Sequence, residues 1–206
     1  MDDLRRYQNA FMDLVCGTNK LSFPVDDKLL RIRIKRLYEL QAPDSIHPFI
    51  MMLLNSVEVS KLTSSSACEM IDCMESFLVR RAVCGIEPTG LHAVFKRLWS
   101  DLESNFTKTK FFLIIKSHKT VQSPNDEAFK ESLIERNLYG SGISNYLLTE
   151  WNTQLGGDKI LSKGTIEHVL PQTITSYWSN NFNKDQHNKY LHRLGKSCSS
   201  FNRRSI

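Results

Sequence analysis

The sequence lacks any C-x-x-C pair, and its cysteines are odd in number, five in all. Disulfide frameworks use even numbers of cysteines, so this pattern predicts reduced, mostly buried thiols in a cytoplasmic protein. The acidic start Met1–Asp3 has no apolar signal core, which argues against export. The longest apolar run, Phe49–Leu54, is far too short to span a bilayer, so no membrane partner is expected.

The sequence also lacks the motifs of several common classes of binding and catalytic site. The sequence has no glycine-rich phosphate loop, and it has no nucleophile-elbow string for serine hydrolysis. His187, His192 and Cys198 could suggest zinc, but a spacing of i, i+5 places two imidazoles about 140° apart around a helix. We therefore expect both histidines to flank a surface helix over residues 185–194.

The composition is that of an ordinary globular protein. With 206 residues, 41% hydrophobic and 24% charged, the chain has room for one large or two small domains. The formal net charge of +5 permits contact with nucleic acid. It does not require such contact, because many of the excess positive side chains could lie on solvated helix surfaces.

Apolar residues recur at helical spacing through the first half of the chain. The clearest case is residues 65–83, where they fall at i, i+3, i+4 and i+7. We expect each of these apolar stripes to be core packing. The other helices are expected near residues 4–16, 24–40, 44–54 and 89–102.

The second half of the chain begins after a polar segment at residues 103–110, which is the expected domain boundary. The run Phe111–Ile115 fits either a short strand or a buried helical turn, and periodicity does not decide between them. Helices are expected over 124–137 and 144–154. The turn at Gly156 and Gly157 then leads into a strand.

The string T-I-E-H-V-L-P-Q at residues 165–172 combines an acid–histidine pair with β-branched and apolar neighbours. Pro171 removes a ladder donor, so Glu167 and His168 should lie at the end of a strand. There the histidine can reach a substrate, and the carboxylate can reach a metal ion without being buried unpaired. On residue type alone, a strand histidine is more often a core residue and a glutamate is usually solvated.

This string closely resembles the opening of an HNH (His-Me finger, ββα-metal) nuclease site. Its I-E-H-x-L-P-Q form resembles the C-terminal domain of GmrSD-type modification-dependent restriction endonucleases. The arginine-pair helix at 74–85, Tyr146–Leu148 and Leu194–Gly195 extend the similarity. The resemblance implies a mainly α (α+β) fold. A multi-helix domain over 1–104 would precede a mixed, HNH-type nuclease domain over 105–206, with an incomplete ββα-metal finger.

The resemblance also implies a chemistry, the metal-dependent hydrolysis of DNA phosphodiesters in phage defence. His168 would be the general base, and Glu167 would supply a hard oxygen ligand to Mg²⁺ or Mn²⁺. Gln172 could hold a phosphate or the loop backbone. Arg80 and Arg81 could contact phosphate, although a salt-bridged helix surface is the commoner fate of such a pair.

Full-length members of this family also carry a nucleotide-dependent sensor domain marked by an aspartate-glycine-glutamine-glutamine-arginine string. This sequence has no such string, so a separate sensor subunit or domain is an implied partner beside DNA. The rival hypothesis is a non-catalytic helical module that binds DNA or a protein. A Mg²⁺-dependent nicking assay distinguishes the two.

The resemblance ends after Gly195. Family members continue with Asn-Leu, an apolar strand and a later metal-binding asparagine, whereas Lys196–Ile206 is polar. Four small polar or thiol residues are not expected to supply the strand, and Asn202 is the substitute candidate for the metal ligand. One inserted A would convert codons for Asn-Leu-Val-Leu-Leu-Ser into Lys-Ser-Cys-Ser-Ser-Phe. We therefore expect a frameshifted, truncated nuclease of weak or no activity. A natural polar terminus is the alternative.

Overall fold

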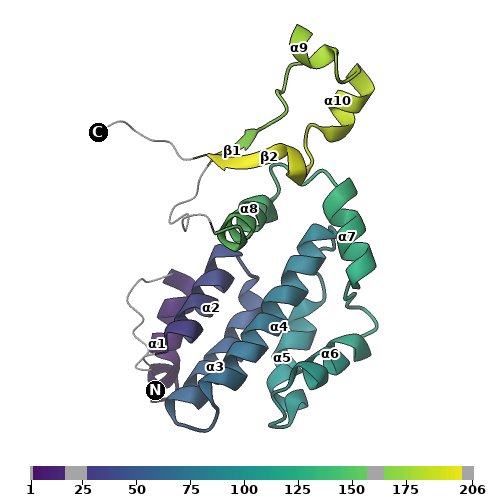
Figure 1. Ribbon diagram of the computed structural model, residues 1–206. Helices are drawn as coiled ribbons and strands as arrows, with labels where there is room; N and C mark the ends of the chain where they lie inside the picture. Colours follow the sequence, from purple (N-terminus) through teal and green to yellow (C-terminus); the bar gives the residue numbers. More distant parts are fainter. Residues whose placement is uncertain (1, 17–26, 157–164, 201–206) are drawn as a thin grey trace, which may run out of the picture. The chain divides into compact units, whose positions relative to one another are not determined.

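The computed structural model describes residues 2–16, 27–156 and 165–200. Over these residues the chain is mostly helical and carries one two-stranded antiparallel sheet (Figure 1). This confirms the expected mainly α fold. The chain divides into two compact units, Met1–Pro124 (unit 1) and Asn125–Ile206 (unit 2).

Unit 1 is built from helices that follow one another closely along the chain. Its described helices are α1 (Asp2–Cys16), α2 (Lys28–Glu39), α3 (His47–Glu58), α4 (Ser64–Val83), α5 (Leu91–Leu102) and α6 (Lys108–Ser117). Side-chain caps fix where several of them begin, because they satisfy backbone donors that no helical carbonyl reaches. Asp27 accepts from the N–H groups of Leu29 and Leu30 at the start of α2. The start expected near Pro24 lies outside the described residues.

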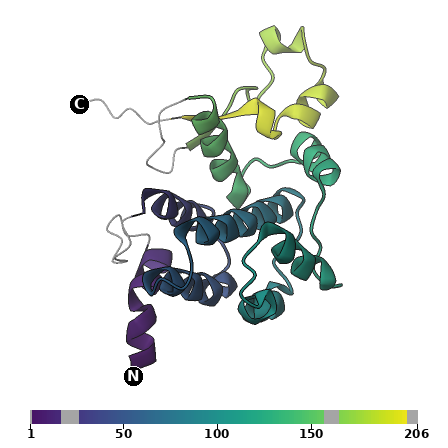
Figure 2. The same cartoon turned by 60° about the horizontal axis from the view of Figure 1, so that its bottom comes forward.

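The core of unit 1 lies around α4, which packs against α2, α3 and α6 (Figures 1 and 2). The predicted helix over 65–83 is confirmed, and its apolar stripe is buried as expected. Phe77 of α4 meets Phe95 of α5 edge to face, with ring centroids 6.3 Å apart. The thiols of Cys68 and Cys73 on α4 are free and buried, in agreement with the sequence prediction.

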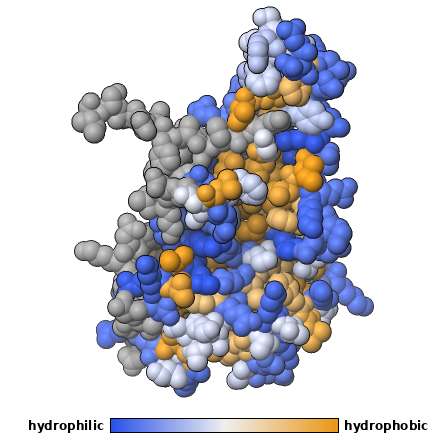
Figure 3. All heavy atoms as spheres, in the orientation of Figure 1, coloured by the Kyte–Doolittle hydropathy of each residue, from blue (hydrophilic) through white to orange (hydrophobic). Residues whose placement is uncertain are grey.

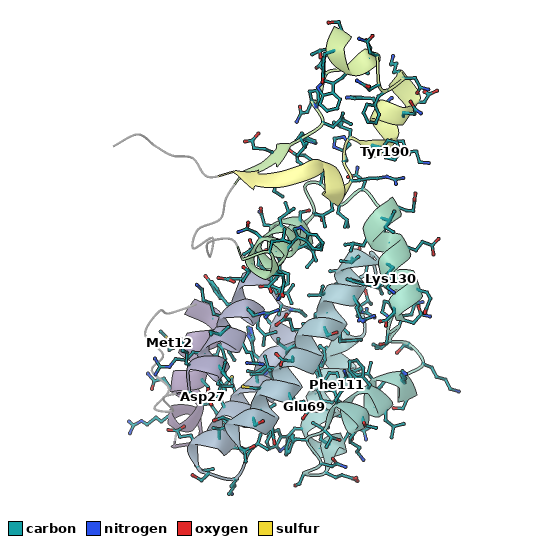
Figure 4. The ribbon with its side chains drawn as sticks, in the orientation of Figure 1. Met12, Asp27, Glu69, Phe111, Lys130 and Tyr190 are labelled. Carbon is teal, nitrogen blue, oxygen red and sulfur yellow. The ribbon has the colours of Figure 1, made fainter. Side chains whose placement is uncertain are left out.

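The run Phe111–Ile115 lies in helix α6 (Figure 4 labels Phe111). Phe111 and Ile115 are fully buried, whereas Leu113 between them is 64% exposed. Burial at positions four residues apart is the period of a helix face, which resolves the alternative in favour of a helix. Since α6 packs against α4 and α5, it belongs to unit 1. The division therefore comes after Pro124 rather than after residue 104.

Unit 2 combines helices with the sheet. Its elements are α7 (Asp126–Glu135), α8 (Gly142–Gln154), β1 (Thr165–His168), α9 (Ser176–Ser179), α10 (Lys184–Tyr190) and β2 (Ser197–Ser200). A capping box between Asn183 and Gln186 begins α10. Helix α8 packs against β2. None of the described helices in either unit has the length and apolar character needed to cross a membrane.

Strands β1 and β2 pair in antiparallel register, with His168 opposite Ser197 and Glu167 opposite Cys198. The polar residues after Lys196 therefore do form a strand, although it is not the apolar strand that the resemblance implied. The ladder is made by backbone N–H and C=O groups, which serine and cysteine carry like any other residue. Low strand propensity lowers the stability of such a pairing without forbidding it.

Candidate functional site

Strand β1 presents the acid–histidine pair at its end, as predicted. Exposure alternates along this stretch: Glu167 and Val169 are exposed, His168 is half-buried, and Leu170 is 1% exposed. Alternation is the period of an extended chain, so the side chains of Glu167 and His168 leave the strand on opposite faces. His168 is the last residue of β1.

The imidazole of His168 contacts three side chains of unit 2. Its Nε2 lies 3.2 Å from Nδ1 of His192, and its Nδ1 lies 3.3 Å from Nε2 of Gln172. The ring of Tyr139 lies against it, with centroids 3.9 Å apart and the planes inclined by 39°. Both ring nitrogens and one face of the imidazole are therefore in contact with protein.

Tyr139 and His192 support each other as well as His168. The backbone N–H of Tyr139 donates to the carbonyl oxygen of His192 at 3.1 Å. Their rings stack, with centroids 5.5 Å apart and 30° between the planes. Beside them, Arg193 forms a bidentate ion pair with Glu135 of α7, at 2.7 and 3.3 Å. The turn after α10 is thus attached to the end of α7 by charge-assisted hydrogen bonds.

The two histidines near α10 differ from the sequence prediction. His187 is only 4% exposed, so it does not lie on a surface face of the helix. Helix α10 ends at Tyr190 (labelled in Figure 4), so His192 follows the helix instead of flanking it. The i, i+5 argument assumed one continuous helix, and the chain turns before the second histidine.

The surroundings of His168 favour its neutral form. Burial lowers the pKa of the His168 imidazole below its ordinary value, and the neighbouring His192 lowers it further, while Glu167 opposes both effects. A histidine with a lowered pKa is largely neutral at pH 7, and a neutral imidazole has a lone pair that can accept a proton.

The remaining predicted site residues are spread over the chain. Gln172 is exposed and contacts His168, which places it in the site. Asn202 lies outside the described residues. Arg80 is half-exposed in the last turn of α4.

Arg81 is only 3% exposed, and its guanidinium donates to the carbonyl oxygens of Gln122 and Glu87. That placement does not suit the phosphate contact considered for Arg81. The side chain instead joins the end of α4 to two loops of unit 1.

Sequence reasoning did not identify Tyr139, and it considered His192 only as a possible zinc ligand and then as part of a helix surface. The sole local signal was the position of His192 two residues before the quoted Leu194–Gly195 pair. Tyr139 follows α7 with no motif around it. Both reach His168 through tertiary contacts, which no spacing within the motif encodes.

The described residues contain no group of three or more histidine, cysteine or acidic side chains arranged to hold a metal ion. Glu167 does place an exposed carboxylate beside His168 in sequence. Magnesium is commonly held by one or two carboxylates together with water and substrate phosphates. A cation at this place would therefore have to take most of its ligands from water and substrate oxygens, with Glu167 as a carboxylate ligand.

Comparison with known proteins places this site in a family context. Residues 123–196 match the model of the family described as GmrSD restriction endonucleases, C-terminal domain. The matched segment contains β1, Gln172 and His192, and it covers less than half of the chain. No curated protein and no solved structure matches the chain. The match supports the C-terminal part of a GmrSD-type restriction endonuclease, as the motif predicted.

Proposed function

We propose that unit 2 is a DNA endonuclease domain of the HNH type, in which His168 is the general base for phosphodiester hydrolysis. The observation that carries this proposal is the half-exposed imidazole of His168 at the end of β1, inside the segment that matches the restriction endonuclease family. A base at a strand end can meet a substrate from solvent, which a buried core histidine cannot.

The antiparallel pair β1–β2 supports the HNH assignment, because the first strand of such a finger delivers the histidine. In the proposed reaction His168 takes a proton from the water molecule that attacks phosphorus, the P–O bond to the leaving sugar oxygen breaks, and that oxygen takes up a proton from solvent. The imidazole ends as an imidazolium, and its lowered pKa keeps it neutral and ready near pH 7.

Glu167 is the proposed protein ligand of Mg²⁺ or Mn²⁺. When bound, the divalent cation supplies positive charge to the phosphate oxygens as a Lewis acid. Glu167 and His168 leave β1 on opposite faces but occupy its last two positions. A phosphodiester that lies across the end of the strand would be within reach of both side chains. Gln172, next to His168, would orient that phosphate.

The surface near the site suits a polyanionic substrate. Helices α9 and α10 carry mainly hydrophilic residues on the face shown in Figure 3. Asn181 and Asn183, between α9 and α10, and Lys184 of α10 are exposed, and such side chains commonly contact phosphate and sugar oxygens of DNA. We propose DNA as the substrate and restriction of foreign DNA as the biological setting.

The test is nicking of a supercoiled plasmid by the full chain, with Mg²⁺ or Mn²⁺ and with a chelator. We expect weak, cation-dependent nicking, in keeping with the polar sequence after Lys196, and a further fall of about 100-fold or more in His168→Ala, since a positioned base contributes about 10²–10⁴ in rate. His92→Ala is the matched control, because His92 is exposed on α5 in unit 1. Equal nicking by both variants, or DNA binding without any cleavage, would overturn the proposal.

A further inference from the structure

We propose that His192 is a positioning residue for His168. By accepting the Nε2–H of His168, it holds the tautomer in which Nδ1 carries the free lone pair. Nδ1 is then the nitrogen that takes the proton from water. This inference rests on the proposed role of His168 as general base, and it adds the identity of the reacting nitrogen.

The two contacts of the His168 ring agree on one tautomer. A neutral imidazole has one donor and one acceptor nitrogen. The amide nitrogen of Gln172, 3.3 Å from Nδ1 of His168, can only donate, so Nδ1 accepts. The hydrogen then resides on Nε2, which donates across 3.2 Å to Nδ1 of His192. The other tautomer of His168, with the hydrogen on Nδ1, would require the Gln172 amide to be rotated by 180° so that its oxygen accepts from Nδ1–H.

His192 is held firmly enough to select this tautomer. Its carbonyl oxygen accepts from the backbone of Tyr139, and its ring stacks on the same tyrosine. The next residue, Arg193, is tied to Glu135 by two hydrogen bonds and lies over the ring of Tyr190. An acceptor fixed by its own neighbours loses little conformational freedom when it orients a base.

The two partners of His168 differ in how easily substrate can displace them. Gln172 is exposed and reaches Nδ1 from the loop after β1, whereas His192 is half-buried against Tyr139. A water molecule at the phosphate can therefore replace the Gln172 amide at Nδ1, while Nε2 keeps its protein partner. A base held at one nitrogen and open at the other is the arrangement that general-base catalysis requires.

Two substitutions separate the hydrogen-bond role of His192 from its bulk. In His192→Asn, the amide oxygen can occupy the place of Nδ1 and still accept a hydrogen bond. In His192→Leu, a side chain of similar size has no acceptor. We expect removal of the acceptor to lower the single-turnover rate at saturating DNA by roughly 10–100-fold, the range found when the orienting partner of a metal-bound imidazole is lost. DNA affinity should not change, and His192→Asn should restore most of the rate.

The deciding readout is the tautomer of His168 itself, measured by long-range ¹H–¹⁵N correlation spectra of the full chain without added metal. We expect Nε2–H in the native protein and in His192→Asn, and a mixture of both tautomers in His192→Leu. Nδ1–H in the native protein, or an unchanged tautomer in a folded His192→Leu, overturns the inference. This readout needs no cleavage. Absence of nicking would therefore contradict only the proposed function. The measured tautomer of His168 would still show whether His192 positions it.

Discussion

The buried imidazole of His187 donates from Nε2 to the carbonyl oxygen of Pro171, with 2.7 Å between the two atoms. Pro171 lies three residues after His168, the last residue of β1, in the loop that follows the strand. Its carbonyl oxygen takes a hydrogen bond from His187 of α10. The loop that carries Gln172 next to His168 is thus held by a residue that the motif does not contain.

Replacing His187 with phenylalanine should destabilise unit 2. The His187→Phe variant keeps an aromatic ring but leaves the Pro171 carbonyl without its donor, at an expected cost of about 1–3 kcal/mol. Chemical denaturation monitored by hydrogen exchange in unit 2 measures this cost. His92→Phe, at an exposed position of α5, should change stability much less. Equal stability of the native protein and His187→Phe would show that the contact is not needed.

Truncating a core side chain of unit 1 should strongly destabilise the protein. Phe77 has no exposed surface and packs edge to face on Phe95, so Phe77→Ala should cost about 3–5 kcal/mol in the free energy of unfolding. Leu113→Ala is the control, since Leu113 is 64% exposed and should stay within about 0.5 kcal/mol. A thermal melt that barely moves for Phe77→Ala refutes the helical core described for unit 1.

The neighbouring arginines of α4 should behave differently. Arg81→Met removes the donors to the carbonyl oxygens of Gln122 and Glu87, which should cost about 1–3 kcal/mol of stability and leave DNA affinity unchanged. Arg80→Met, at a half-exposed position, should cost less. Denaturant unfolding and DNA-binding titrations of both variants test this. If a stable Arg81→Met variant bound DNA more weakly, the result would instead support a contact between Arg81 and phosphate.

Asp27 should give a stability contribution that depends on pH. Hydrogen bonds from backbone N–H groups, that of Leu30 first, lower the pKa of the Asp27 carboxyl below 3.8. The stabilisation is therefore complete above the unfolded pKa and is lost as the pH falls through the lower folded pKa. Asp27→Ala should cost about 1 kcal/mol at pH 7. Asp27→Asn keeps a capping oxygen without the titration, so its unfolding free energy should lack this pH dependence.

Helical periodicity predicted much of the fold of unit 1. The helix predicted over residues 65–83 corresponds to α4 (Ser64–Val83). The prediction succeeded because burial of one apolar face determines both where the helix forms and which side faces the core. The short run Phe111–Ile115 was ambiguous for the opposite reason. Five apolar residues fit both periods, and only the contacts of α6 with α4 and α5 select the helix.

The candidate site was predictable only in part. The position of His168 at a strand end followed from β-branched neighbours and Pro171, which are local features. The partner strand β2 and the contact with His192 did not follow. A serine-rich strand has little local propensity, and the two histidines are 24 residues apart in the chain. Such contacts depend on the packing of α7, α10 and the sheet, which a single sequence does not display.

The central claim is that the imidazole of His168 acts as a base, and rescue by added imidazole tests it most directly. His168→Ala leaves a space against the ring of Tyr139, where a free imidazole can bind. The account predicts that imidazole restores part of the single-turnover cleavage by His168→Ala and none by Glu167→Gln, because imidazole cannot replace a carboxylate ligand. Failure to restore any cleavage in folded, DNA-binding His168→Ala would contradict the account, as would cleavage at the native rate before imidazole is added.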